Sequence, residues 1–144
     1  MPKIFFASDH GGYKLKKELK NHLQKKYITE DLGCRSEESC DYPDFGHSLA
    51  EKIMNEPNAV GLALCGTGLG ISMVLNRHPG IRAARCASIN DVKMARQHND
   101  ANVLVIGGRT TNKIIARQMV DIFLLTKFEK GRHISRIEKI DISN

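Results

Sequence analysis

A cysteine followed by a glycine-rich segment is the part of this sequence with the clearest chemistry. Cys65 comes directly after the apolar run 60–64, and Gly66, Gly68 and Gly70 follow at alternate positions. The pattern predicts a buried strand that ends at the thiol and a helix that begins just after it. Because helix N-termini favour anions, such a segment suits a thiolate base, a phosphate or a developing oxyanion. A tight turn beside a structural cysteine is the alternative, although glycines are destabilising unless the backbone needs them.

Two familiar phosphate-binding motifs do not fit this segment. The P-loop requires a lysine after its last glycine, and none follows Gly70. The dinucleotide fingerprint requires Gly-x-Gly-x-x-Gly and an acidic residue about 20 positions further on. Here the glycines alternate, and residues 86–90 contain no acid. Neither ATP nor NAD is therefore favoured as a ligand.

The elements that must position this segment alternate between strand and helix. Strands are expected at 4–8, 27–32, 58–64, 81–86 and 102–106, and helices at 13–26, 44–55, 69–76, 90–97, 111–126 and 134–140. Asn90 is expected to cap the fourth of these helices. Repeated β–α–β units predict a parallel sheet with helices on both faces. The expected fold is a three-layer α/β/α, Rossmann-like, doubly wound sheet of about five parallel strands with a C-terminal helix, in one domain over 1–144.

This architecture brings other reactive side chains to the edge where Cys65 lies, because open parallel sheets bind ligands beyond the carboxyl ends of their strands. The first strand is followed by Asp9 and His10, and the fifth by Arg109. Each has an ordinary explanation by itself, Asp9 as a helix cap and the other two as solvated surface groups. Together with the thiol and the backbone amides, they indicate acid–base chemistry on a small anionic molecule.

Three further residues stand elsewhere in the predicted fold. His98 comes just before the fifth strand, so within one chain it is expected at the opposite edge of the sheet from Cys65. It either has a structural role at a helix end or completes a site on a neighbouring subunit. Arg132 and Arg136 are four residues apart on one helix face. They could hold a phosphate, or pair with the acidic residues beside them.

The composition of the chain further narrows the classes of protein to which it can belong. A chain of 144 residues can bury a core without disulfides, and its four cysteines show neither Cys-x-x-Cys nor zinc spacing with histidine. We therefore expect reduced thiols in a cytoplasmic protein, with no metal site. No signal-peptide pattern and no apolar stretch of membrane-spanning length occur, so no membrane association is expected. The net charge is +6, but aromatic residues make up only 6%, and nucleic acid is a minor alternative as partner.

Six segments, in order along the chain, resemble the B-type ribose-5-phosphate isomerases, a family that includes allose- and galactose-6-phosphate isomerases. They are residues 8–16, 41–44, 65–72, 80–83, 96–102 and 131–133, which together extend over nearly the whole chain. The resemblance implies interconversion of ribose 5-phosphate and ribulose 5-phosphate in the pentose phosphate pathway, without metal or cofactor. It also implies a homodimer or a dimer of dimers with active sites shared between subunits.

The resemblance implies catalytic roles for the matching residues. Cys65 would be the base that moves a proton between C1 and C2 of the open-chain sugar, and Thr67 would assist proton movement between the oxygens. His98, with Asp9 nearby, would open the furanose ring. The enediolate would be stabilised by the backbone amides of Gly66, Thr67, Gly68, Leu69 and Gly70.

The remaining roles concern substrate binding. Tyr42 would lie against the sugar, and Asn99 would bind oxygens of the sugar or the intermediate. The phosphate would be surrounded by His10, Arg109, Arg132 and Arg136. A branch of the family without the cysteine uses a glutamate just after the last glycine; Ile71 stands there in this chain, which implies the cysteine mechanism.

Residues 76–79 and 87–90 depart from the family pattern, and neither stretch contains a proposed catalytic group. Four alternatives stay open at this point. They are an isomerase for 6-phosphate hexoses, a catalytically inactive partner subunit, a flavodoxin-like nucleotide-binding module and a nucleic-acid-binding protein.

Overall fold

The computed structural model describes residues 1–142, and its centre is a five-stranded, entirely parallel sheet. The strands are β1 (Ile4–Ser8), β2 (Thr29–Asp31), β3 (Val60–Cys65), β4 (Ala83–Arg85) and β5 (Val103–Gly107), in the order β2-β1-β3-β5-β4. The helices are α1 (Tyr13–Leu23), α2 (Tyr42–Asn55), α3 (Leu69–Leu75), α4 (Ile89–Asn99), α5 (Lys113–Leu125) and α6 (His133–Glu138), and a short 3₁₀ turn spans His10–Gly12.

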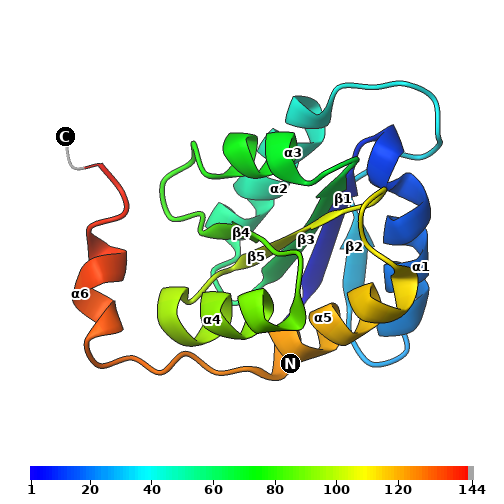
Figure 1. Cartoon of the computed structure of the whole chain (residues 1–144). Helices are drawn as coiled ribbons and strands as arrows, with labels where there is room; N and C mark the ends of the chain where they lie inside the picture. The colour runs from blue at the N-terminus through cyan, green and yellow to red at the C-terminus, as the bar shows by residue number, and fades with distance from the viewer. Residues whose placement is uncertain (143–144) are drawn as a thin grey trace.

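Two helical layers cover the two faces of the sheet (Figure 1). Helices α1, α4 and α5 pack on one face, and α2 and α3 pack on the other. Successive strand residues point to opposite faces, so Leu64 joins the core beneath α1 and α5 while Cys65 joins the core beneath α2 and α3. The predicted three-layer α/β/α fold is confirmed, and this alternation decides which helices the Cys65 thiol faces.

The three central strands are almost entirely buried, which explains why they read as continuous apolar runs in the sequence. The edge strands β2 and β4 pair on one side only, over three residues each. The strands expected at 27–32 and 81–86 were therefore too long. The predicted cap of α4 was also wrong: Ser88, not Asn90, caps the helix, because its Oγ accepts the N–H of Asp91 at 3.1 Å.

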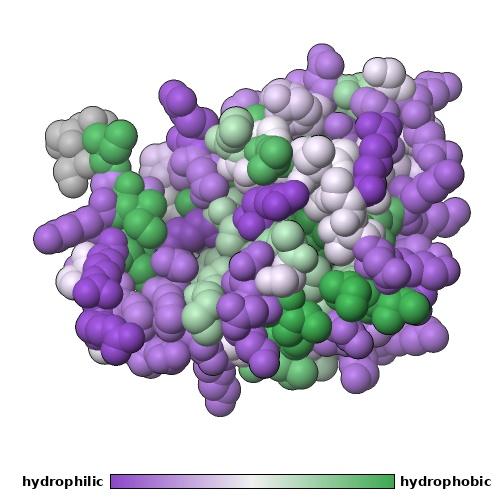
Figure 2. Space-filling model, in the orientation of Figure 1, coloured by the Kyte–Doolittle hydropathy of each residue, from purple (hydrophilic) through white to green (hydrophobic). Residues whose placement is uncertain are grey.

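After α5 the chain leaves the sheet and forms a C-terminal arm, residues 126–142, which carries α6 beside the main body (Figure 1). The N–H of Glu129 donates to the carbonyl of Gln97, and the N–H of Gly80 donates to the Asp141 carboxylate at 3.0 Å. The arm exposes Ile140 and Ile142, and Figure 2 shows apolar surface along it. Over residues 1–142, no helix combines the length and the apolar character that crossing a membrane requires.

Candidate active site

The loops that follow β3 and β5 are joined backbone to backbone at the carboxyl edge of the sheet. Cys65 lies in register with Gly107, the last residue of β5. Beyond the strands, the N–H of Gly108 donates to the carbonyl of Cys65 at 2.8 Å, and the N–H of Arg109 donates to the carbonyl of Gly66 at 2.9 Å. The ladder therefore continues past its strands and fixes the loop that begins at the thiol.

Glycines allow three loops to touch at this edge. A Cβ on Gly108 would lie 2.4 Å from the carbonyl oxygen of Gly11, and a Cβ on Gly11 would lie 2.9 Å from the nitrogen of Gly66. No side chain fits there, so the loops after β1, β3 and β5 meet through bare backbone. Gly68 is glycine for a second reason, since its φ of +80° lies in the left-handed region just before α3 begins.

The segment after Cys65 presents backbone N–H groups that suit an anion. Within residues 1–142, no backbone or side-chain acceptor takes the N–H of Gly66, Thr67 or Gly68. The N–H of Leu69 differs, because it donates to the Oγ1 of Thr67 at 3.3 Å. Gly70 likewise has no acceptor for its N–H, so four of the five amides predicted to face an oxyanion have no competing partner within residues 1–142, and one is already engaged.

Cys65 is only 4% exposed and lies in the core layer that contains Ile71 of α3. Tyr42, the first residue of α2, extends its ring to the start of α3. A Cβ on Gly70 would lie 2.5 Å from Cζ of the Tyr42 ring. The ring therefore lies directly on the start of α3, beside the cysteine loop. The contact of Tyr42 with the sugar stays a prediction.

Asp9 is buried and acts as a cap. Its Oδ1 accepts the N–H of Gly11 at 2.9 Å and that of Gly12 at 3.2 Å, which holds the turn that presses Gly11 onto the β3 loop. His10 stands at the same edge, where its Nδ1 accepts the N–H of Cys40 at 3.2 Å. A neutral imidazole that accepts at Nδ1 carries its proton on Nε2, which can donate to an anion.

Two arginines lie over the cysteine loop, and one of them was predicted from the sequence. The exposed Arg109 follows β5, and a Cβ on Gly66 would lie 3.3 Å from its Nη1. Arg85, the last residue of β4, was missed: its Nε donates to the carbonyl of Thr67 at 3.1 Å. The sequence contained a feature that could have identified Arg85, because it is a basic residue at the carboxyl end of a parallel strand. Arg85 fixes the loop and adds positive charge beside its amides.

Four predicted site residues lie away from this edge. Asn99 ends α4 at the start of β5, on the opposite side of the sheet, and His98 precedes it. Arg132 and Arg136 are exposed on the C-terminal arm, and within residues 1–142 neither forms an ion pair with an acidic neighbour. The structure therefore does not support simple pairing as the role of the two arginines.

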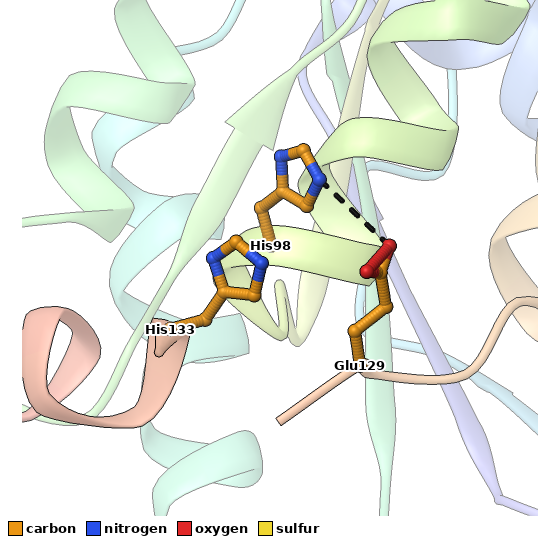
Figure 3. Close-up of side chains that lie close together, drawn as sticks. All are labelled: His98, Glu129 and His133. Atoms are coloured by element: carbon orange, nitrogen blue, oxygen red, sulfur yellow. Dashed lines mark ion pairs between the residues drawn. The ribbon is translucent and has the colours of Figure 1, made fainter. Parts of the chain in front are cut away.

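His98 belongs to a small cluster with the arm (Figure 3). Its Nε2 lies 3.8 Å from Oε1 of Glu129, and its ring stacks on that of His133 with centroids 4.5 Å apart and planes inclined by 15°. His133 is largely buried, and burial together with the neighbouring His98 lowers the pKa of its imidazole below the ordinary value. The cluster keeps α6 against α4.

Comparisons with known proteins cover nearly the whole chain. A family model described as Ribose/Galactose Isomerase matches residues 4–140. Ribose-5-phosphate isomerase B of Escherichia coli is 39% identical over 141 residues, covering 97% of this chain and 95% of that protein. A ribose 5-phosphate isomerase structure from Thermotoga maritima is 47% identical, with a TM-score of 0.94 over 97% of both chains. The Mycoplasma genitalium ribose-5-phosphate isomerase B structure, with bound ribulose-5-phosphate, is 41% identical, with a TM-score of 0.92 over 96% of this chain and 93% of that one.

Proposed function

The chain belongs to the ribose/galactose isomerase family, and from this premise we propose that it interconverts ribose 5-phosphate and ribulose 5-phosphate through an enediolate. It is an aldose–ketose isomerase of the pentose phosphate pathway that needs no cofactor. One observation carries the mechanism: the buried Cys65 ends β3, and the N–H groups of Gly66, Thr67 and Gly68 that follow it have no acceptor within residues 1–142.

The reaction needs a base beside a carbon and positive potential beside an oxygen. In the proposed step, the Cys65 thiolate removes the proton from C2 of the open-chain aldose, and the C–H electrons form the double bond of the enediolate. The negative charge that develops on O1 meets the amides of the glycine loop. Thr67 assists transfer of a proton from O2 to O1, and the Cys65 thiol returns its proton to C1, which gives the ketose.

The phosphate is far from the reacting carbons, so contacts to it supply binding and positioning energy. Within one chain, His10 and Arg109 stand at the edge where Cys65 lies and can hold it. We assign Arg132 and Arg136 to the same phosphate, contributed by a second subunit. Their exposure on the arm supports this assignment, since they remain available to a partner.

The same reasoning supports a two-fold homodimer, or a dimer of dimers, with shared sites. His98 and Asn99 cannot join Cys65 across their own sheet, whereas a partner subunit can bring them there. The apolar arm, with Ile134, Ile140 and Ile142 exposed, offers a surface for that contact. His98 then opens the furanose ring with Asp9 nearby, and Asn99 binds sugar oxygens.

Other aspects of the proposal rest on composition and chemistry. Cytoplasmic location fits four cysteines without disulfide bonds. A nucleic-acid partner is not proposed, because aromatic residues, which stack on bases, make up only 6% of the sequence. An isomerase for 6-phosphate hexoses is not favoured, because the relatives described above are named as ribose-5-phosphate isomerases.

A coupled assay tests the proposed reaction. Ribose 5-phosphate should be converted with a kcat/KM well above that for allose 6-phosphate or galactose 6-phosphate, and the product should be identified as ribulose 5-phosphate. Turnover of a hexose phosphate in preference to the pentose would replace the proposed substrate. Absence of turnover on all three, with tight nucleotide binding, would favour the nucleotide-binding module.

Gly70→Ala tests the placement of Tyr42 against the sugar. The added methyl would lie 2.5 Å from Cζ of Tyr42, so the ring must move away. Because Tyr42 is proposed to contact the substrate, kcat/KM should fall by about tenfold or more, a loss that small misplacements can cause. In the Tyr42→Ala background the same change should have little further effect, since the clash is gone. Additive losses in the double variant would contradict the proposed contact.

Chelation tests the absence of a metal requirement. After extended EDTA treatment and dialysis, isomerase activity should persist, because the proposed mechanism takes its positive potential from backbone amides and arginines. The measurement is initial rate before and after treatment, with elemental analysis as the control for metal removal. An enzyme that loses activity and regains it with added zinc or magnesium would contradict the mechanism.

A further inference from the structure

Three potential metal ligands converge where the C-terminal arm meets α4 (Figure 3). His98 lies near the end of α4, Glu129 lies in the segment before α6, and His133 is the first residue of α6. The ligand atoms of the three side chains all lie within 4.8 Å of one another. Their spacing in the sequence matches no zinc motif, so no metal site is predicted from the sequence alone.

One ligand atom of this cluster lacks any partner in the part of the chain that the structure describes. The Nε2 of His133 is buried and forms no hydrogen bond within residues 1–142, and the whole residue is only 6% exposed. Buried polar atoms nearly always have a partner, so this nitrogen indicates a group that residues 1–142 do not supply. Figure 3 shows a ring nitrogen of each histidine turned toward the Glu129 carboxylate.

We propose that His98, Glu129 and His133 form a binding site for a divalent transition-metal ion, with Zn²⁺ as the expected ion. Two imidazoles and a carboxylate are a zinc donor set that leaves a coordination position open, and imidazole ligands favour zinc, copper or nickel over magnesium or calcium. The site links α4 to the arm through three ligands from three segments.

Metal binding requires a modest rearrangement. Zinc–ligand distances of about 2.0–2.2 Å in tetrahedral geometry place ligand atoms about 3.3 Å apart, so the cluster must contract and the stacked rings must tilt. Both His98 and Glu129 are partly exposed, with side-chain exposures of 36% and 49%, and can turn toward the buried His133. The buried His133, whose Nε2 has no partner within residues 1–142, is thus the ligand that stays in place.

The expected consequence is inhibition, and this part rests on the proposed function. Ring opening by His98 needs an imidazole nitrogen that can exchange a proton with the sugar. A metal ion bound to that imidazole occupies the nitrogen and holds the ring against the arm. Zinc should therefore inhibit the isomerase reversibly, while the metal-free enzyme stays fully active.

Cobalt binding tests the site without reference to activity. The metal-free, full-length protein is titrated with Co²⁺ and followed by visible absorption, and Zn²⁺ affinity is measured by calorimetry. Glu129→Gln and His133→Ala should each weaken metal binding by at least about tenfold. Removing a residue that only hydrogen-bonds a metal ligand already lowers metal affinity by about that much, and these two variants remove the ligands themselves. Glu129 is half-exposed, so its variant is expected to fold normally, and thermal melting checks both.

His47→Ala is the matched control. His47 Nδ1 lies 2.7 Å from His78 Nε2 on the surface, which makes this pair the competing imidazole site. Its variant should bind Co²⁺ as the unaltered protein does. Binding that is unaffected by Glu129→Gln and His133→Ala, or that disappears in His47→Ala, would overturn the proposal, as would an absence of stoichiometric binding.

An inhibition assay then tests whether metal bound at this site affects isomerisation. The Zn²⁺ concentration for half-inhibition should rise at least about tenfold in Glu129→Gln, in parallel with the loss of affinity. Stoichiometric binding at the three residues without inhibition would confirm the site and overturn its link to His98 chemistry. If the protein proves inactive on ribose 5-phosphate, the absorption titration still decides the metal site by itself.

Discussion

Replacing Cys65 by alanine should nearly abolish isomerisation while leaving sugar-phosphate binding largely intact. The thiol is the only proposed base for proton transfer between C1 and C2, and loss of a general base lowers rates by about 10²–10⁴. The proposed phosphate ligands His10 and Arg109 are untouched, because their positions depend on backbone contacts that do not involve the sulfur atom. Cys65→Ser should also be poor, since a hydroxyl is far less acidic than a thiol.

The measurements are kcat in the coupled assay and the thermal shift produced by a sugar-phosphate ligand. Cys86→Ala is the matched control: Cys86 is also buried, directly after β4, and burial raises the pKa of its thiol to about 12. It is therefore protonated at neutral pH and has no proposed role, so kcat should be retained. Near-wild-type turnover of pure Cys65→Ala enzyme would exclude the cysteine mechanism.

Two inactive variants should restore each other's activity when their subunits combine. If each site takes Cys65 from one subunit and His98 from the other, a heterodimer of Cys65→Ala and His98→Ala has one doubly defective site and one intact site. Random pairing makes half of the dimers heterodimers, so activity should approach about a quarter of wild type. Each variant alone should be nearly inactive, which makes the gain easy to detect.

Co-expression with two different affinity tags ensures that heterodimers form and can be purified. The control is a pair that cannot complement: Cys65→Ala combined with a Cys65→Ala, His98→Ala double variant, in which every site lacks its base. Verified heterodimers with no more activity than either parent would show that the site is not shared, and His98 would then have the structural role that its stacking on His133 supplies.

The sequence predicted the sheet, and which side chains lie at its carboxyl edge, for a physical reason. Central parallel strands are buried on both faces, so they appear as apolar runs, and parallel strands all end at the same edge. Asp9, His10, Cys65 and Arg109 each follow such a run, and the structure places them all at that edge. The edge strands gave a weaker signal, because β2 and β4 are short and only partly buried.

Only the tertiary structure decided how distant segments meet. The sequence placed glycines beyond three strands, but the order β2-β1-β3-β5-β4 decided that Gly11 touches both Gly66 and Gly108. The hydrogen bond from Arg85 to the Thr67 carbonyl and the cluster of His98 with the arm depend in the same way on contacts between remote segments. Periodicity and capping report interactions over a few residues, whereas these contacts depend on how whole elements pack, and no local pattern specifies that packing.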